Sequence, residues 1–169
     1  MTHRTACLVA GATLLFACSD GTGPSSGTFR AQLRGAHVAA LFGPSNARAF
    51  ATEESPDPRF VINMFAPQGD TIRFLSVGCP GQEPPEPGTY SVAESESACH
   101  GSYVRLLSTL ENGTIIFERL SASSGVVRIS AVEQGLTAGT FDFSGTLVVG
   151  ETPAGVMGAS GSFNATTVP

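Results

Sequence analysis

The sequence predicts an all-β domain, and three of its features lead to that prediction. From Thr28 onward, apolar and polar residues alternate with a period of two, which is typical of strands with one buried face. No stretch after Cys18 shows the periodicity of an amphipathic helix. Glycine, proline and asparagine recur between the apolar runs, at the spacing of hairpin turns. About ten strands are expected, in an antiparallel β-sandwich or, as the alternative, in a closed antiparallel β-barrel, and the sandwich is the preferred prediction.

The first expected strand begins at Thr28 and is broken at Gly35, with Phe29, Ala31 and Leu33 on one face. The next four strands are expected at His37–Phe42, Ala47–Thr52, Arg59–Ala66 and Asp70–Val77. The last two form the clearest hairpin of the chain, because they are rich in strand-forming residues and flank a short turn at Pro67-Gln68-Gly69.

The remaining strands follow a proline-rich stretch that ends at Pro87. They are expected at Gly88–Val92, Ser102–Thr109, Thr114–Leu120, Val126–Val132, Leu136–Val149 and Gly155–Thr166. Turns are expected at Glu111-Asn112-Gly113 and at Ser121–Gly125.

Four of the expected strands open with glycine, a hydroxyl residue and an aromatic residue, whose rings belong to Phe29, Tyr90, Phe141 and Phe163. The glycine permits a turn or bulge, and the ring is expected to enter the core. Phe141 and Phe143 lie two residues apart, so both rings should face the interior while Asp142 faces solvent.

Composition excludes several classes of function. The formal net charge is −5 at pH 7, so the protein should repel nucleic acid and anionic membrane surfaces. The chain contains no lysine, which excludes a Walker-type phosphate loop, a Schiff-base lysine and a serine–lysine dyad. No motif calls for a cofactor.

The N-terminus begins with His3 and Arg4 and continues as an uncharged apolar run, Cys7–Ala17, that is too short to span a bilayer as a helix. This run ends in Leu15-Phe16-Ala17-Cys18, which resembles the lipobox of bacterial lipoproteins. The resemblance implies that residues 1–17 are a signal peptide, and that Cys18 becomes the lipidated N-terminus, with a diacylglyceryl thioether and an acyl chain such as palmitate. Two or three acyl chains make a stable membrane anchor.

Three segments are therefore expected: the signal peptide at 1–17, the lipidated cysteine with a flexible tether at 18–27, and a single all-β domain at 28–169. The domain resembles small uncharacterised all-β bacterial lipoproteins over Gly88–Ala165. The shared motifs are Pro-Gly-Thr-Tyr at residues 87–90, Gly-x-Phe-x-Phe at 139–143 and Gly-Ser-Phe-Asn at 161–164. Ser19 after the cysteine resembles the enteric sorting pattern for the outer membrane, so the implied location is the bacterial cell envelope, with the lipid anchor in the outer membrane.

Two cysteines remain in the exported chain, Cys79 and Cys99, and an even pair in an oxidising compartment predicts a disulfide. It would hold the proline-rich segment Pro80–Pro87. The alternative joins Cys79, Cys99 and His100 as three zinc ligands, but no fourth ligand is evident and no metal site is predicted.

Other polar residues suggest weaker sites. His37 lies in an apolar strand and His100 in a loop, and neither has a serine in a Gly-x-Ser-x-Gly motif. Glu53, Glu54 and Asp57 lack the ligand pattern of a calcium loop. Glu94 and Glu96 are a possible carboxylate pair, which surface solubility explains equally well.

The sequence-based hypothesis is a membrane-anchored envelope lipoprotein that is not an enzyme. Its β domain would bind an unknown protein or small-molecule ligand, or serve a structural role. One alternative is an envelope hydrolase that uses a carboxylate pair or a metal, and it requires His37, His100 and two acids around one concavity. A second alternative is a barrel that binds a lipophilic ligand in a cavity lined by phenylalanines.

Overall fold

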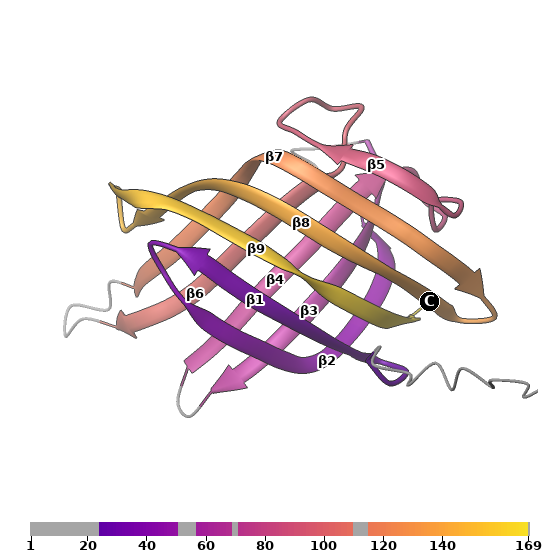
Figure 1. Cartoon of the computed structure of the whole chain (residues 1–169), viewed down its shortest axis with the longest axis horizontal. Coiled ribbons are helices and arrows are strands. Elements are labelled where there is room, and N and C mark those ends of the chain that lie inside the picture. Colours follow the sequence, from indigo (N-terminus) through magenta and orange to yellow (C-terminus); the bar gives the residue numbers. More distant parts are fainter. Residues whose placement is uncertain (1–23, 51–56, 69–70, 110–114, 169) are drawn as a thin grey trace, which may run out of the picture.

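The computed structural model describes residues 24–50, 57–68, 71–109 and 115–168. These residues form nine strands and no helix (Figure 1). The strands are β1 (Thr28–Gly35), β2 (Ala39–Phe50), β3 (Arg59–Gln68), β4 (Thr71–Pro80), β5 (Gly88–Val92), β6 (His100–Thr109), β7 (Ile115–Glu133), β8 (Leu136–Val149) and β9 (Thr152–Thr167).

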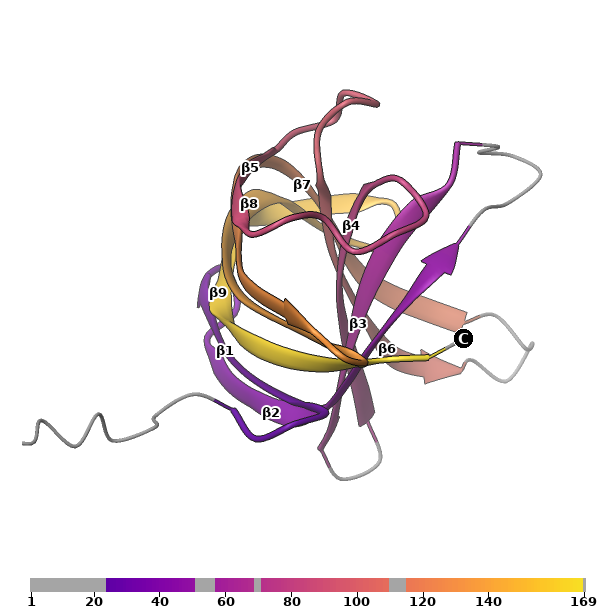
Figure 2. The same ribbon diagram turned by 90° about the vertical axis from the view of Figure 1, so that its right-hand side faces the viewer.

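Eight of the strands form a closed antiparallel barrel. Their order is β7-β6-β4-β3-β2-β1-β9-β8, and the pairing of β8 with β7 closes the ring. Figure 2 shows β1, β8 and β9 curving along one side and β3, β4 and β6 forming the opposite side. The remaining strand, β5, pairs with the second half of β7, beyond the part of β7 that pairs with β6, and its Val92 also forms an isolated bridge with Cys99. Closure leaves the barrel strands with few exposed edges, which protects them from pairing with another chain.

The all-β prediction is confirmed, the preferred sandwich is wrong, and the barrel alternative is correct. The reason is that two strands run through positions where the sequence predicts breaks. Residues 39–50 form one strand through Gly43-Pro44, so β2 pairs first with β1 and then with β3. Residues 115–133 likewise continue through the turn expected at 121–125, with bulges that bend β7 along its pairing with β8. A long bent strand shared between successive neighbours carries the sheet around into a ring.

The predicted hairpin at Arg59–Ala66 and Asp70–Val77 is confirmed, and its pairing extends to Gln68 opposite Thr71. The strand predicted at Gly88–Val92 has the same bounds as β5, and the one predicted at Leu136–Val149 has those of β8. β9 begins at Thr152 and so includes part of the predicted loop near Gly150.

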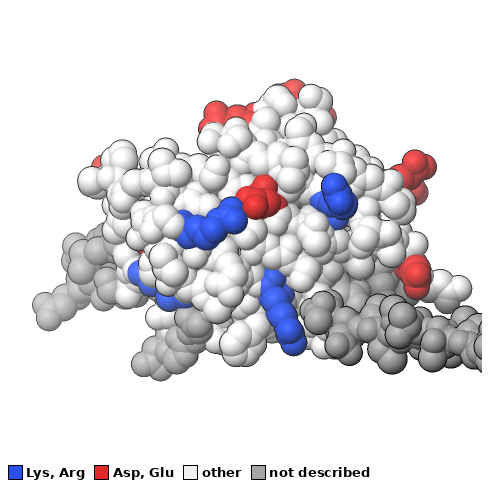
Figure 3. Space-filling model, in the orientation of Figure 1, with Lys and Arg blue, Asp and Glu red and all other residues white. Residues whose placement is uncertain are grey.

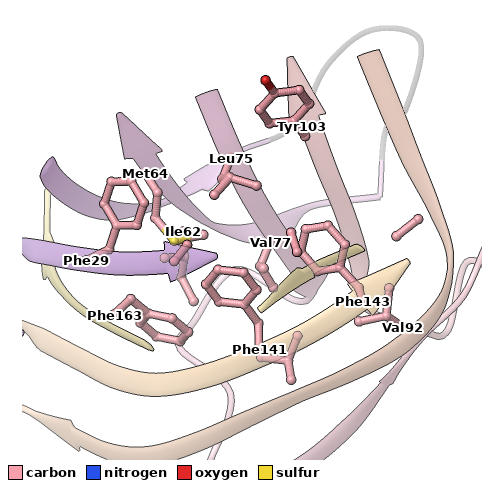
Figure 4. Close-up of a cluster of buried hydrophobic side chains, with 14 of the residues drawn as sticks. Phe29, Ile62, Met64, Leu75, Val77, Val92, Tyr103, Phe141, Phe143 and Phe163 are labelled. Atoms are coloured by element: carbon pink, nitrogen blue, oxygen red, sulfur yellow. The ribbon is translucent and has the colours of Figure 1, made fainter. Parts of the chain in front are cut away.

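The core fills the barrel. Phe141 and Phe143 are 3% and 1% exposed and stack with ring centroids 5.5 Å apart, as the period-two pattern predicts. Phe29 and Phe163 are also buried, and Figure 4 shows these rings gathered with aliphatic side chains from facing strands. Gly101 provides space for one ring, because a Cβ at that position would lie 2.8 Å from the Phe143 ring. Side chains thus occupy the interior, as is typical of eight-stranded barrels.

The two ends of the barrel differ in what they contain. The hairpin end, at the left in Figure 1, is where the β1–β2 and β8–β9 turns lie, and where β3, β6 and β8 end. The terminal end is where the described chain begins and stops: the Gly27 N–H donates to the Asn164 carbonyl, and the Val168 N–H donates to the Ala47 carbonyl. The disulfide between Cys79 and Cys99 also lies toward the terminal end, because Cys79 is near the end of β4 and Cys99 just precedes β6.

Candidate functional site

A row of three charged residues crosses the inner face of the barrel at its hairpin end. The strand register places Arg73 of β4 opposite Arg105 of β6, and Arg105 opposite Glu118 of β7. Two residues deeper, the same three strands bring together Leu75, Tyr103 and Leu120, all of which are buried. The interior therefore changes from apolar to charged between neighbouring rows of the barrel.

Glu118 is the centre of this group, and its side chain is only 5% exposed. Its Oε2 lies 2.6 Å from the Arg105 Nε and accepts a 3.4 Å hydrogen bond from the Tyr103 hydroxyl. Its Oε1 lies 3.8 Å from the His37 Nδ1. Figure 4 shows the Tyr103 hydroxyl directed away from the phenylalanine rings. We call His37, Arg73, Tyr103, Arg105 and Glu118 the charged cluster.

The turn between β1 and β2 brings His37 to the cluster. Gly35 has a φ of 87°, a conformation that glycine adopts without strain. The Ala36 N–H then donates a 2.9 Å hydrogen bond to the Val156 carbonyl on β9. The turn is thereby attached to the barrel wall, and the imidazole lies against Glu118 instead of in solvent.

The two arginines are incompletely satisfied. The Arg105 Nε is close to Glu118, but its N–H bond has no well-aligned acceptor, so the contact is an ion pair and not a directed hydrogen bond. The Arg73 Nε and Nη1 are shielded from solvent and have no hydrogen-bond partner among the described residues. Buried donors without partners are rare and costly in folded proteins, so this guanidinium requires an explanation.

Burial also sets the protonation of the cluster. Desolvation lowers the pKa of His37 below 6.5; Glu118 opposes this shift, while Arg105 and Arg73 add to it. His37 is therefore neutral at pH 7. Desolvation, reinforced by Glu118, raises the pKa of Tyr103 to about 12, so its hydroxyl stays a donor. With two guanidinium groups and one carboxylate, the charged cluster carries a formal charge of +1 inside a protein of net charge −5.

The clearest hollows among the described residues lie elsewhere, on the outer face of the barrel. The largest, about 600 Å³, is an open groove over β1, β2, β8 and β9. Figure 3 shows that one face of the molecule is mostly neutral, with scattered charged side chains. A second hollow of about 370 Å³ lies over β2, β3, β4 and β6 and includes Phe50, Phe74 and Arg48. Neither contains a residue of the charged cluster, which the interior packing encloses.

The predicted Cys79–Cys99 disulfide is present in the structure. The zinc alternative is wrong, because sulfurs joined to each other are not thiolate ligands. His37 and His100 do not share a site: His100 begins β6, away from the hairpin end, and its Nε2 lies 3.2 Å from the Ser95 carbonyl oxygen. No group of three potential metal ligands occurs among the described residues.

The predicted carboxylates do not form a site in the described part of the chain. Glu94 and Glu96 lie in the exposed turn between β5 and β6, and not on one strand face. Asp57 is exposed, whereas Glu53 and Glu54 lie outside the described residues. Cys18 and the lipobox lie outside them as well.

The sequence analysis missed four of the five cluster residues, although a signal for them was present. In β4, Arg73 is in phase with Leu75 and Val77, and in β7, Glu118 is in phase with Leu120. A charged residue that keeps the phase of buried apolar residues is expected to point inward, where it needs a partner.

No family model, curated protein or solved structure matches the chain. Within the described residues, no helix has the length and apolar character needed to cross a membrane.

Proposed function

We propose that the protein is a lipid-anchored component of the bacterial cell envelope, held in the outer membrane through Cys18, and that its barrel is a binding domain without enzymatic activity. The lipobox supports the anchor, and the Cys79–Cys99 disulfide is consistent with an oxidising compartment. The membrane would be a partner only through the lipid on Cys18. Nucleic acid is not an expected partner of so acidic a chain.

The observation that carries the binding role is the charged cluster at the hairpin end of a barrel whose interior is otherwise mostly apolar. A hydrolase activates water with a general base, most often a histidine, or with a metal. His37 is available as such a base, but His100 and the second acid that the hydrolase alternative requires are not beside it. Its neighbour Glu118 lies beside two arginines, and this arrangement favours holding an anion. The lipophilic-barrel alternative has less support, because Phe29, Phe141 and Phe143 fill the interior that a ligand would need.

The anchor is tested by replacing its cysteine. Cys18→Ala should abolish labelling with radioactive palmitate and move the protein from the membrane fraction to the soluble fraction. Cys7→Ala, within the proposed signal peptide, is the matched control and should leave labelling unchanged. Normal labelling of the Cys18→Ala protein would contradict the proposal.

The binding role is tested on the full chain carrying Cys18→Ala. Screening small molecules for saturable thermal stabilisation should find ligands, because a ligand that binds only the folded state raises its stability. Incubation with ester, amide, phosphoester and glycoside substrates should give no turnover above that of the heat-denatured protein. Turnover that follows the protein through purification would favour the hydrolase alternative.

A further inference from the structure

We propose that the hollow of about 370 Å³ on the outer face of the barrel binds a sugar acid, a pyranose ring that carries a carboxylate. We call it the outer hollow, and it lies over β2, β3, β4 and β6, on the side of the barrel that β3, β4 and β6 form in Figure 2. The inference rests on the proposed role as a binding domain, but neither on the charged cluster nor on the lipid anchor.

The outer hollow is centred on a residue without a side chain. Gly78 of β4 lies between Val61 of β3 and His100 of β6 in one row of the sheet, and all three line the hollow. A Cβ at Gly78 would lie 3.5 Å from the Val61 Cγ2, an ordinary van der Waals distance, so the packing of the strands does not require this glycine. The volume of the hollow falls in the range of roughly 300 to 1,000 Å³ that is typical of small-molecule sites.

The next row of the sheet supplies a polar floor. The strand register aligns Asn63 of β3, Ser76 of β4 and Ser102 of β6, which all line the hollow. Asn63 is only 8% exposed, and its Nδ2 donates a long hydrogen bond of 3.4 Å to the Asn46 Oδ1. The Ser76 and Ser102 hydroxyls lie 2.7 Å apart, so one donates to the other and the accepting hydroxyl keeps its own hydrogen for a third group. A buried amide and a hydroxyl donor at the base of a hollow suit a ligand with several hydroxyl groups.

An aromatic ring forms the wall on the hairpin side of the outer hollow. Phe74 is half-buried and lies two residues before Ser76 on β4. The Phe65 ring packs edge-on against it, with ring centroids 4.9 Å apart, and this contact holds the Phe74 ring in place. The C–H face of a pyranose can pack on such a ring while the hydroxyl groups of the sugar reach the floor. A purely apolar ligand would cover the Asn63 amide without giving it a partner, which is costly.

The opposite side of the outer hollow is cationic. Arg48 and Arg59 line it, and none of its described lining residues is acidic, in a chain of net charge −5. Arg48 lies over the Phe50 ring with its Cζ 5.6 Å from the ring centroid, a contact that uses the face of the guanidinium and none of its N–H donors. Arg59 donates to three backbone carbonyl oxygens, which bring it no counter-charge. A carboxylate on the ligand would match this side of the hollow.

The aromatic and cationic sides are spaced for one sugar ring with its substituents. Arg48 on β2 and Phe74 on β4 are two strands apart, which is about 10 Å in a sheet. The larger groove over β1, β2, β8 and β9 lacks this combination: none of its described polar lining residues is buried, and its aromatic residue, Phe42, is 71% exposed. The outer hollow is therefore the better site for a sugar acid.

The test uses the full chain carrying Cys18→Ala, in a buffer without carboxylates, with sodium glucuronate as the probe. Calorimetric titration should show saturable binding, and the backbone amide signals of Ser76, Gly78 and Ser102 should shift in NMR spectra. Glucose keeps the ring without the charge and should bind about tenfold or more weakly, because the charge-assisted hydrogen bonds are lost. Hexanoate keeps the carboxylate without the hydroxyl groups and should also bind about tenfold or more weakly, because the polar floor is left without partners.

Two variants locate the site. Gly78→Leu should fill the outer hollow and abolish glucuronate binding, and Ser162→Leu, which adds the same side chain on the outer face of β9, is the matched control and should bind normally. If Gly78→Leu does not fold, Gly78→Val, whose side chain favours strands, takes its place. Arg48→Gln should weaken glucuronate binding by about tenfold and leave the affinity for glucose unchanged. Arg128→Gln, at an exposed position on β7, is its control and should change neither.

Three results would overturn the inference: no saturable glucuronate binding, hexanoate binding as tight as that of glucuronate, or unchanged glucuronate affinity in a folded Gly78 or Arg48 variant. Binding that Arg73→Gln abolishes and a folded Gly78→Leu protein retains would assign the sugar acid to the charged cluster, and would overturn it as well. If glucuronate fails while other ligands stabilise the protein, the broader binding role stands and only this inference falls.

Discussion

The two ends of the barrel are completed by different chemistry. Toward the terminal end, the Cys79–Cys99 disulfide joins two buried cysteines, and Cys99 forms a bridge with the buried Val92. At the hairpin end, the inner face of the barrel instead carries two arginines and a glutamate, with a histidine from the β1–β2 turn beside them. A covalent closure without ionised groups is insensitive to pH and salt. An ionic closure depends on both, and here it leaves two Arg73 donors without partners among the described residues. The comparison therefore separates a covalently fixed end from an end whose stability varies with pH and salt.

The largest expected loss of stability comes from the packed core between the two ends, and the losses at either end can be compared with it. Phe141→Ala removes a ring that is 3% exposed and stacked on Phe143, so it should cost about 3 to 5 kcal/mol of the free energy of unfolding. Urea denaturation would measure it. A cost below about 1 kcal/mol would show that this part of the barrel is not the tightly packed centre.

Removing the covalent closure should be next in size. Replacing Cys79 and Cys99 together by serine opens a loop of 20 residues and should lower stability by about 3 kcal/mol in the chain-entropy model. The loss should be the same at low and high salt. Mass analysis of the unreduced exported protein should find the two cysteine peptides joined, and freely alkylated thiols would refute the pairing.

Removing the charge of Glu118 at the hairpin end should lower the free energy of unfolding by less, and this loss should depend on the salt concentration. Glu118→Gln leaves Arg105 and Arg73 without a counter-charge and should lower stability by about 2 kcal/mol, because Arg105 is partly exposed and solvent compensates in part. Glu133→Gln, at an exposed position, is the control and should have little effect. Added salt should recover part of the loss in Glu118→Gln. Equal losses for both variants would remove the distinction between the two ends.

His37 should make the hairpin end sensitive to pH. Its folded-state pKa lies below 6.5, so the unfolded chain binds more protons there than the folded chain does. Stability from this group is fully present above pH 6.5 and is lost as the pH falls through the lower, folded-state pKa. His37→Gln should flatten the stability profile over that range, with Glu118, Arg73, Arg105 and Tyr103 unchanged in both proteins. Identical profiles would contradict the shift.

The smallest change in stability is expected from a substitution on the outer face of the barrel. Asp142 is 55% exposed and forms a 2.7 Å ion pair with Arg34, which is also exposed. Pairs of this kind contribute little, so Asp142→Ala should change stability by about 0.5 kcal/mol or less. If Asp142→Ala were more damaging than Phe141→Ala, the inward and outward faces of β8 would be reversed.

The sequence predicted local structure better than closure. Alternation identified the inward faces of β1 and β8, and the turn residues identified the β3–β4 hairpin, because both signals lie within a few neighbouring residues. Gly43-Pro44 and Ser121–Gly125 resemble breaks, yet pairing on both sides carries β2 and β7 through them. A ring and a sandwich differ in such long-range pairings, which local patterns do not contain.

The charged cluster shows the same limit. His37 was noticed as a polar residue in an apolar run, but its partners Arg73, Arg105 and Glu118 come from three other strands. Their inward phase could be read from the alternation. Their meeting depends on the register between strands, which only the folded sheet sets.

The attachment of the chain at the terminal end also has a mechanical consequence. The tether proposed to begin at Cys18 would join the barrel at Gly27, before β1, while the charged cluster lies at the opposite end of the strands. β1 is paired with β2 from Thr28 to Leu33 and with β9 from Thr28 to Gly35. A pull between a bound partner and the membrane would therefore run along β1 and load these rows of hydrogen bonds together, in shear, so the barrel would resist force better than a domain peeled open one bond at a time.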